Sequence, residues 1–164
     1  VWGHLAETPL VIEAPVGRSA GDRKRMTVRE NGREARTDAR VLARFGVVDL
    51  LHLALHSGRT HQIRVHLAHV GHPVVGDPVY GGGGSRRISG ERRREAESLE
   101  RLTPRQALHA ALLAFRHPVS GTPMHFLSEW PQDLSPVLEA AAAGSGLVAQ
   151  PVSLRYLGFL EQHG

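Results

Sequence analysis

Cysteine is absent from this 164-residue sequence. This excludes a disulfide framework, a thiolate nucleophile and a zinc site built on cysteine. Lysine is nearly absent too, because Lys24 is the sole lysine among 20 lysine and arginine residues. No uninterrupted apolar run approaches the roughly 20 residues that span a bilayer, and no segment has the pattern of a signal or transit peptide. These absences favour a cytoplasmic protein.

The positive charge therefore resides almost entirely on arginine, with a formal net charge of +4 and a sequence pI of about 10.6. The planar guanidinium fork matches phosphates and base edges, although a genomic codon bias would enrich arginine equally well. Hydrophobic residues make up 41% of the chain and charged residues 22%, which is ordinary for a globular protein of one domain. Composition thus makes nucleic acid a candidate partner without establishing it.

The first third of the chain has the pattern of strands. Residues 5–18 are extended in character, and Asn31-Gly32 suits a two-residue hairpin turn whose central residues both have positive φ. Residues 35–56 predict a second hairpin with its turn near Gly46. Apolar side chains alternate in its first half, as expected for a half-buried strand.

A helical period follows at residues 61–70, where apolar side chains recur at i, i+4 and i+7. Thr60 is the expected N-cap of this helix, and Gly71 is the residue expected just past its end. Pro73 prevents much continuation. The sequence therefore predicts a helix that starts immediately after a Gly-Arg-Thr loop.

Residues 107–144 have the pattern of two strands followed by a helix. Residues 107–127 predict two strands joined by a turn at Ser120-Gly121, and a helix is expected from Pro131 to a stop at Gly144. The tail, residues 145–164, is not placed by its pattern. Hairpins interspersed with helices predict an α+β domain with a mixed, largely antiparallel sheet and flanking helices.

Between these parts, residues 82–106 combine a glycine run with dense arginine and glutamate. Such a composition predicts a solvated, flexible insertion with little to anchor a core, and with any helix confined to about residues 91–102. The glycines lack the Lys-Ser/Thr pair that follows them in a phosphate-binding loop.

Candidate functional groups gather in SGRTHQIRVHLAHVGHPVVGDPVYGG, residues 57–82. Arg59, His61, Gln62 and Arg64 lie at the start of the predicted helix, where free N–H groups and two guanidiniums favour an anion. This arrangement predicts a site that faces a phosphate or carboxylate and offers polar groups to a planar ligand.

Two other interpretations of this segment are weaker. Its histidines, at spacings of 5, 3 and 3 residues, match no standard zinc motif, so we expect no metal. Asp77 would suit a general base or nucleophile, but an aspartate in a Gly-Asp-Pro turn more often accepts hydrogen bonds from nearby backbone N–H groups. We therefore expect a structural role for Asp77.

The segment GRTHQIRVHLAHVGHPVVGDPVYG resembles the signature of the RluA-type RNA pseudouridine synthases. Further stretches resemble the same family in the same order: VWGH at residues 1–4, NGREARTDARVL at 31–42, LHAALLAFRHPVSG at 108–121 and WPQDL at 130–134. The resemblance covers roughly residues 1–138 and implies the C-terminal part of a catalytic domain, residues 1–144. It implies isomerisation of uridine in ribosomal or transfer RNA without a cofactor.

The resemblance also implies roles for individual residues. Family members use an aspartate that attacks uridine, a tyrosine that stacks on the base and an arginine that pairs with the aspartate. The arginine falls on Arg64, which would keep its partner ionised. Arg59, His61 and Gln62 would support the site or contact RNA, and Leu108 would line the uracil pocket, although a core position suits Leu108 equally well.

The family's His-Arg-Leu-Asp motif and its tyrosine have no counterpart in these 164 residues. We therefore expect a fragment that is inactive alone and whose partners are RNA and the N-terminal half of the same domain. Two alternatives remain open: a non-catalytic RNA-binding module derived from the family, and a metal-dependent hydrolase, for which the histidine spacing argues poorly.

Overall fold

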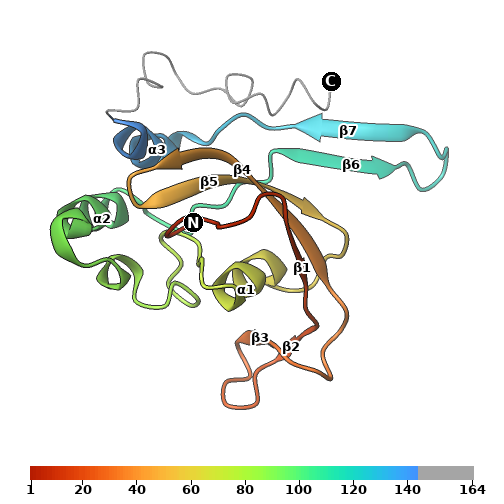
Figure 1. Cartoon of the computed structure of the whole chain (residues 1–164). Coiled ribbons are helices and arrows are strands. Elements are labelled where there is room, and N and C mark those ends of the chain that lie inside the picture. The colour runs from red at the N-terminus through yellow and green to blue at the C-terminus, as the bar shows by residue number, and fades with distance from the viewer. Residues whose placement is uncertain (144–164) are drawn as a thin grey trace.

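A computed structural model describes residues 1–143 of the chain. Its centre is a three-stranded antiparallel sheet in the order β1–β4–β5, formed by Leu10–Glu13, Arg36–Phe45 and Val48–Leu55 (Figure 1). β4 and β5 form the hairpin predicted over residues 35–56, with Phe45 paired to Val48 across the turn at Gly46. The α+β class with antiparallel pairing is confirmed.

A second hairpin, β2 (Val16–Arg18) and β3 (Met26–Val28), projects from one end of the molecule (Figure 1). The hairpin predicted at Asn31-Gly32 is wrong, because neither residue has positive φ. The Gly32 N–H instead donates to the Arg29 carbonyl in a tight turn, and Arg33 then pairs with Val16. A long-range pairing thus overrides the local turn preference.

Helix α1, Gln62–His69, confirms the helix predicted over residues 61–70. Thr60 is not its N-cap, because His61 occupies that position with φ of 55° and makes no side-chain capping bond. Gly71 ends the helix as predicted, with φ of 87°. The N–H groups of Gly71 and His72 donate to the carbonyls of Ala68 and Leu67, which satisfies the last turn.

One face of α1 packs against the central sheet. Leu67 is fully buried there and meets Ile12 of β1, with Leu53 of β5 and Ile63 at the edge of the same cluster. Val65, on another side of α1, is buried against Val16. The helix is thus held by both hairpins, and its N-terminus is fixed relative to the sheet.

The segment 82–106 contains two 3-10 turns, η1 (Gly84–Arg87) and η2 (Gly90–Arg92), and helix α2, Arg93–Arg101. The helix lies within the predicted limits. The expectation that little in the segment anchors a core is wrong, because Ala96 and Leu99 are 0% and 1% exposed. Two apolar residues at i and i+3 suffice because Phe45 and Val47 of the β4–β5 hairpin region belong to the same cluster.

The remaining described elements are β6 (Leu112–Arg116), β7 (Pro123–Leu127), η3 (Gln132–Leu134) and α3 (Ser135–Ala142). β6 and β7 pair across the predicted turn and extend away from the body as a two-stranded sheet (Figure 1). Pro131 precedes η3, and the proline in the first turn of α3 is Pro136. The predicted stop at Gly144 and the tail, residues 145–164, lie outside the described residues.

The burial of α2 gives a test of its anchoring role. Leu99→Ala removes a side chain that is 1% exposed, so the free energy of unfolding should fall by about 2–5 kcal/mol. Leu102→Ala, at a position 38% exposed just past the same helix, is the matched control and should change it by less than about 0.5 kcal/mol. Urea unfolding measures both. Equal, small effects would contradict the packing of α2 into the core.

Candidate functional site

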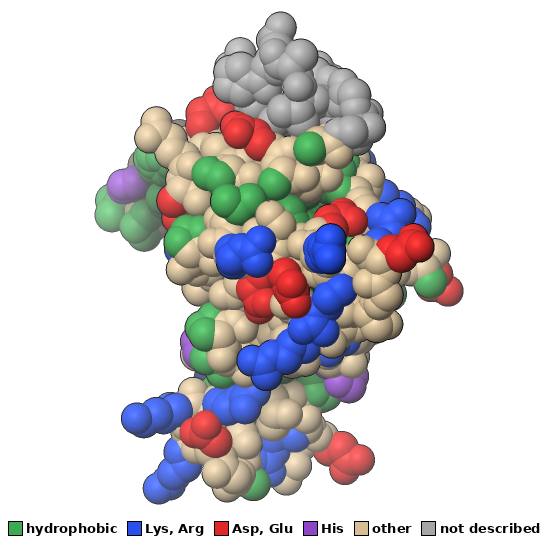
Figure 2. Space-filling view, turned by 90° about the vertical axis from the view of Figure 1, so that its left-hand side faces the viewer, with side chains coloured by type: hydrophobic (Ala, Val, Ile, Leu, Met, Phe, Trp, Pro, Cys, Tyr) green, Lys and Arg blue, Asp and Glu red, His purple; other side chains and the backbone are tan. Residues whose placement is uncertain are grey.

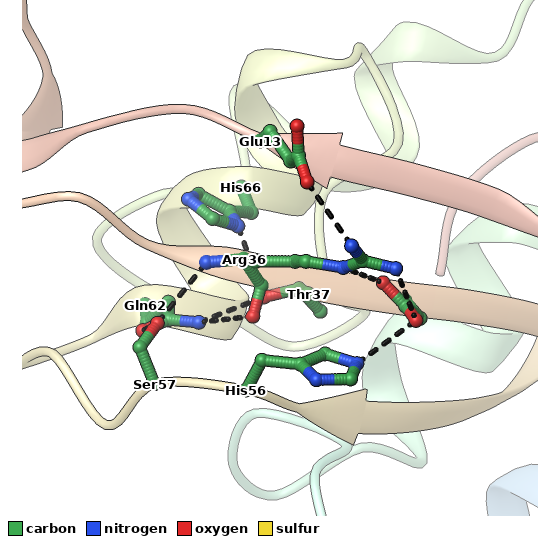
Figure 3. A network of polar contacts seen from close by, with 8 residues as sticks. Glu13, Arg36, Thr37, His56, Ser57, Gln62 and His66 are labelled. Atoms are coloured by element: carbon green, nitrogen blue, oxygen red, sulfur yellow. Dashed lines mark hydrogen bonds and ion pairs between the residues drawn. The ribbon is translucent and has the colours of Figure 1, made fainter.

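Gln62, the first residue of α1, fixes the loop that leads into the helix. Its side-chain oxygen accepts hydrogen bonds from the Ser57 hydroxyl at 2.8 Å and the Arg59 N–H at 3.0 Å. Its amide nitrogen donates to the Arg36 carbonyl and the Thr37 hydroxyl, both at 3.0 Å (Figure 3). Because Gln62 is 3% exposed and fully bonded, it supports the loop from behind and does not present its amide to solvent.

The same network continues to His66, one turn further along α1. His66 Nδ1 lies 2.9 Å from the Thr37 hydroxyl and Nε2 lies 2.9 Å from the Ala14 carbonyl. The carbonyl requires a proton on Nε2, so Nδ1 accepts the Thr37 hydroxyl proton. Burial lowers the pKa of His66, and the ring is therefore neutral at neutral pH. This neutral ring joins the helix to β4 and to the segment after β1.

A chain of ion pairs lies beside this network on the surface. The Arg36 guanidinium contacts Asp38 at 2.9 Å and Glu13 at 3.2 Å, and His56 Nε2 lies 2.9 Å from Asp38 (Figure 3). These side chains are between 27% and 66% exposed, so solvent screens their attraction. Their contribution to stability is small compared with that of the buried Thr37–Gln62–His66 contacts.

Arg64 points to the other side of α1 and meets a buried carboxylate. Its Nε and Nη2 donate to Oδ2 and Oδ1 of Asp77, both at 2.7 Å, in a two-pronged fork. The Asp77 side chain is 0% exposed and the Arg64 side chain 12%. Burial pushes the pKa of Asp77 upward, but hydrogen bonds from Arg64 and from backbone N–H groups outweigh it, so the pKa lies below its ordinary value.

Asp77 also organises the turn in which it lies. Its Oδ1 accepts the backbone N–H groups of Val79 and Tyr80, each at 2.9 Å. This is the backbone-capping role expected of an aspartate in a Gly-Asp-Pro turn. The fork to Arg64 was not anticipated. A single carboxylate thus fixes both the turn and the guanidinium.

Tyr80 lies under the Arg64 guanidinium, with Cζ of Arg64 4.8 Å from the ring centroid. A second guanidinium, that of Arg25, lies 5.4 Å from the same centroid. The tyrosine hydroxyl accepts the Met26 N–H and lies 2.9 Å from His61 Nδ1. The Tyr80 ring thus holds one face of the Arg64 guanidinium by cation–π attraction, while Asp77 holds the edge formed by Nε and Nη2.

The other two predicted site residues lie apart from this cluster. Arg59 Nε donates to the Glu34 carbonyl at 3.1 Å. Leu108 is partly buried against the cluster that contains Leu67, and it lines an apolar groove of about 700 Å³ between β5, β6 and α3. Arg64 is not among the residues that line the groove. The structure brings Arg64 and His61 together around Tyr80, whereas Leu108 packs near Ile63 and Leu67 on another side of α1.

Two features are absent from residues 1–143. Within this range no three histidine, aspartate or glutamate side chains come close enough to hold a metal ion. Among the same residues no helix combines the length and the apolar character needed to cross a membrane.

Asp77 and Tyr80 are the members of the cluster that sequence reasoning did not place beside Arg64. They lie 13 and 16 positions after Arg64 in the chain, and only the path of the loop between them brings the three side chains together. The available signal was the Asp-x-x-Tyr spacing in GDPVY, which places a carboxylate in a turn three residues before an aromatic ring.

Comparison with known proteins points in one direction. A family model described as RNA pseudouridylate synthase matches residues 5–69. A ribosomal large subunit pseudouridine synthase D from Nitrosomonas europaea is 48% identical over 140 residues, 85% of this chain and 38% of the relative. The protein of the same name from Escherichia coli K12 is 42% identical over 141 residues, 86% of this chain and 42% of the relative.

Solved structures agree in fold. Human RNA pseudouridylate synthase domain containing 1 superposes with a TM-score of 0.63 at 28% identity, over 85% of this chain and 55% of that protein. The chain thus spans about two fifths of the length of the curated relatives it matches.

The buried neutral His66 gives a pH test of the network. The unfolded chain takes up a proton near the ordinary pKa of 6.5, whereas the folded ring resists protonation. The free energy of unfolding should therefore fall as pH decreases below about 6.5, by at most about 1.4 kcal/mol per pH unit from this group. His66→Gln should flatten this dependence in denaturant titrations, while the exposed neighbour His69→Gln should not. Equal slopes in the two variants would contradict a buried neutral His66.

Proposed function

Because this chain belongs to the RluA-type RNA pseudouridine synthase family, we propose that it supplies part of a site that converts uridine in RNA to pseudouridine. The observation that carries the proposal is the Arg64 guanidinium, fixed by Asp77 and Tyr80 within the sequence GRTHQIRVH. The names of the relatives favour RNA of the large ribosomal subunit as the substrate. A cytoplasmic location is part of this proposal.

The proposed reaction is an isomerisation and needs no cofactor. The bond between N1 of the base and C1′ of the ribose breaks, and a bond between C5 and C1′ forms. The proton on C5 is lost and N1 gains one, so that atoms and electrons balance within the nucleotide. An attacking carboxylate, an aromatic ring that holds the base and a cation suffice.

Arg64 is the proposed cation. A guanidinium beside a carboxylate favours the ionised form, which is the form that attacks. Arg59 and His61 lie at the same end of α1 and would contact the RNA backbone, and Gln62 would support their loop from its buried position. Leu108 would form part of an apolar wall for the base, on the groove side of the chain.

We propose that the attacking aspartate and the stacking tyrosine come from the N-terminal half of the domain, as the length of the relatives suggests. The apolar groove supports an additional packed segment. Leu50, Leu53 and Trp130 line it, so a docked segment would cover apolar side chains that the groove otherwise leaves open to solvent.

RNA contact would rest largely on the β2–β3 hairpin. Residues 18–33 carry six lysines and arginines against two carboxylates, so this hairpin region alone accounts for the formal net charge of +4. Figure 2 shows Lys and Arg side chains in a band across one face and around the end where the hairpin lies. Phosphate contacts of this kind are sequence-independent and position the protein on the RNA.

The activity prediction uses this chain fused behind the N-terminal half of the Nitrosomonas europaea relative. Loss of tritium from C5 of labelled uridine in large-subunit ribosomal RNA measures turnover. The fusion should be active and the 164-residue chain alone inactive. Arg64→Ala should lower kcat by on the order of 100-fold. Arg64→Lys should be impaired as well, because an ammonium cannot reproduce the fork.

Two results would contradict the proposal that this chain supplies Arg64 to a site whose nucleophile comes from the N-terminal half. One is pseudouridine formation by the chain alone, because it would place a nucleophile within these residues. The other is an active fusion whose rate does not depend on Arg64. RNA binding without turnover by the fusion would instead favour the non-catalytic RNA-binding module. Circular dichroism of each variant verifies that it folds.

The salt prediction tests the hairpin as the RNA contact. Arg23, Lys24 and Arg33 are exposed, and their joint replacement by Gln should weaken RNA binding and flatten the plot of log affinity against log salt by about 2. The matched control removes three exposed charges elsewhere, at Arg86, Arg94 and Arg101, and should leave the slope unchanged. Filter binding of labelled RNA at several salt concentrations measures both. Equal slopes would show that the hairpin makes no such contacts.

A further inference from the structure

The guanidinium of Arg64 is held on two sides by its own chain. Nε and Nη2 are engaged with Asp77, and the ring of Tyr80 covers one face. Among residues 1–143, the buried side-chain nitrogen and oxygen atoms without a partner are the indole nitrogens of Trp2 and Trp130. Nη1 of Arg64 makes no hydrogen bond within residues 1–143 and is not one of these buried atoms, and the Arg64 side chain is 12% exposed. Nη1 is therefore open to a second acceptor.

The balance of charge around Tyr80 favours a negatively charged acceptor. Two guanidiniums, those of Arg25 and Arg64, lie over the ring, while Asp77 supplies the carboxylate bonded to Arg64. Arg25 donates to the carbonyl of Val79, which is neutral. Beside one buried carboxylate stand two cations, so a further anion at Nη1 would be attracted.

The orientation of the guanidinium is set independently of that anion. Asp77 is itself fixed by the N–H groups of Val79 and Tyr80, and the Tyr80 hydroxyl is fixed by Met26 and His61. An arginine side chain has several rotatable bonds and loses substantial entropy when it is ordered. Here that cost is met during folding, before any ligand arrives.

We propose that Asp77 and Tyr80 are positioning residues, and that Arg64 bridges two carboxylates. It would hold Asp77 through Nε and Nη2 and the attacking aspartate through Nη1 alone. This inference rests on the proposed function. It specifies that Arg64 contacts the attacking aspartate through a single hydrogen bond. The direction of that bond is set by Asp77, which does not touch the substrate.

Two simpler roles for Asp77 predict different behaviour. If Asp77 only shapes its turn, its loss lowers stability and leaves the pH dependence of turnover unchanged. If Asp77 only competes for the charge of Arg64, its loss strengthens the hold of Arg64 on the nucleophile, and activity then extends to lower pH. If Asp77 positions Arg64, its loss weakens that hold, and the acid limb of activity moves to higher pH.

The experiment measures kcat against pH for the fusion with and without Asp77→Asn. The acid limb should move upward by roughly one pH unit or more, with kcat reduced much more than KM is raised. Tyr80→Phe keeps the ring beneath the guanidinium and should shift the limb less. Asp133→Asn is the matched control, because Asp133 makes a similar fork with Arg105 on the surface, at 2.7 and 3.1 Å.

Asp77→Glu keeps the carboxylate but displaces it, so the acid limb of its kcat profile should lie between those of the parent and Asp77→Asn. If Asp77→Asn does not fold, Asp77→Glu tests the positioning role in its place. An unchanged or lowered limb in the folded variants would overturn the positioning role. If Arg64→Ala loses turnover but the acid limb of the Asp77 variants does not move, the inference about Asp77 fails and the proposed function stands. If Arg64→Ala leaves turnover intact, the function itself fails.

Discussion

The fork between Arg64 and Asp77 is the interaction on which the site depends. A buried carboxylate is costly unless it is paired and hydrogen-bonded, and Asp77 meets this requirement through Arg64 and two backbone N–H groups. The same contacts tie α1 to the loop that follows it. Removal of either partner would leave the other charge buried and unpaired, so the pair constrains the position of both segments.

The opposite side of α1 is secured by neutral groups. Gln62 and His66 converge on the Thr37 hydroxyl of β4 and reach the backbone at Arg36 and Ala14. The helix is thus bonded to the sheet on one side and to the Asp77 turn on another. A short helix of eight residues can therefore present a guanidinium in one orientation, although a helix of that length is marginal in isolation.

Local patterns were sufficient for some elements of the fold. The 3.6-residue period and Gly71 predicted α1, and alternation with a glycine turn predicted the β4–β5 hairpin, because both are decided by neighbouring residues. The hairpin turn predicted at Asn31-Gly32 is wrong because Val16, which is not a sequence neighbour, pairs with Arg33 and determines the path of the turn. The burial of Leu99 was missed for a similar reason, since its apolar neighbours come from distant segments. For the site, the motif identified Arg64, but its partner Asp77 required the tertiary path of the chain.

A double-mutant cycle on Arg64 and Asp77 tests the central claim most directly. The free energy of unfolding is measured by urea titration for the parent chain, Arg64→Ala, Asp77→Asn and the double variant. A fork that holds the site predicts a coupling energy of at least about 1 kcal/mol, with the double variant less destabilised than the sum of the singles. Additive effects would show that the two side chains do not stabilise each other, and would contradict the account.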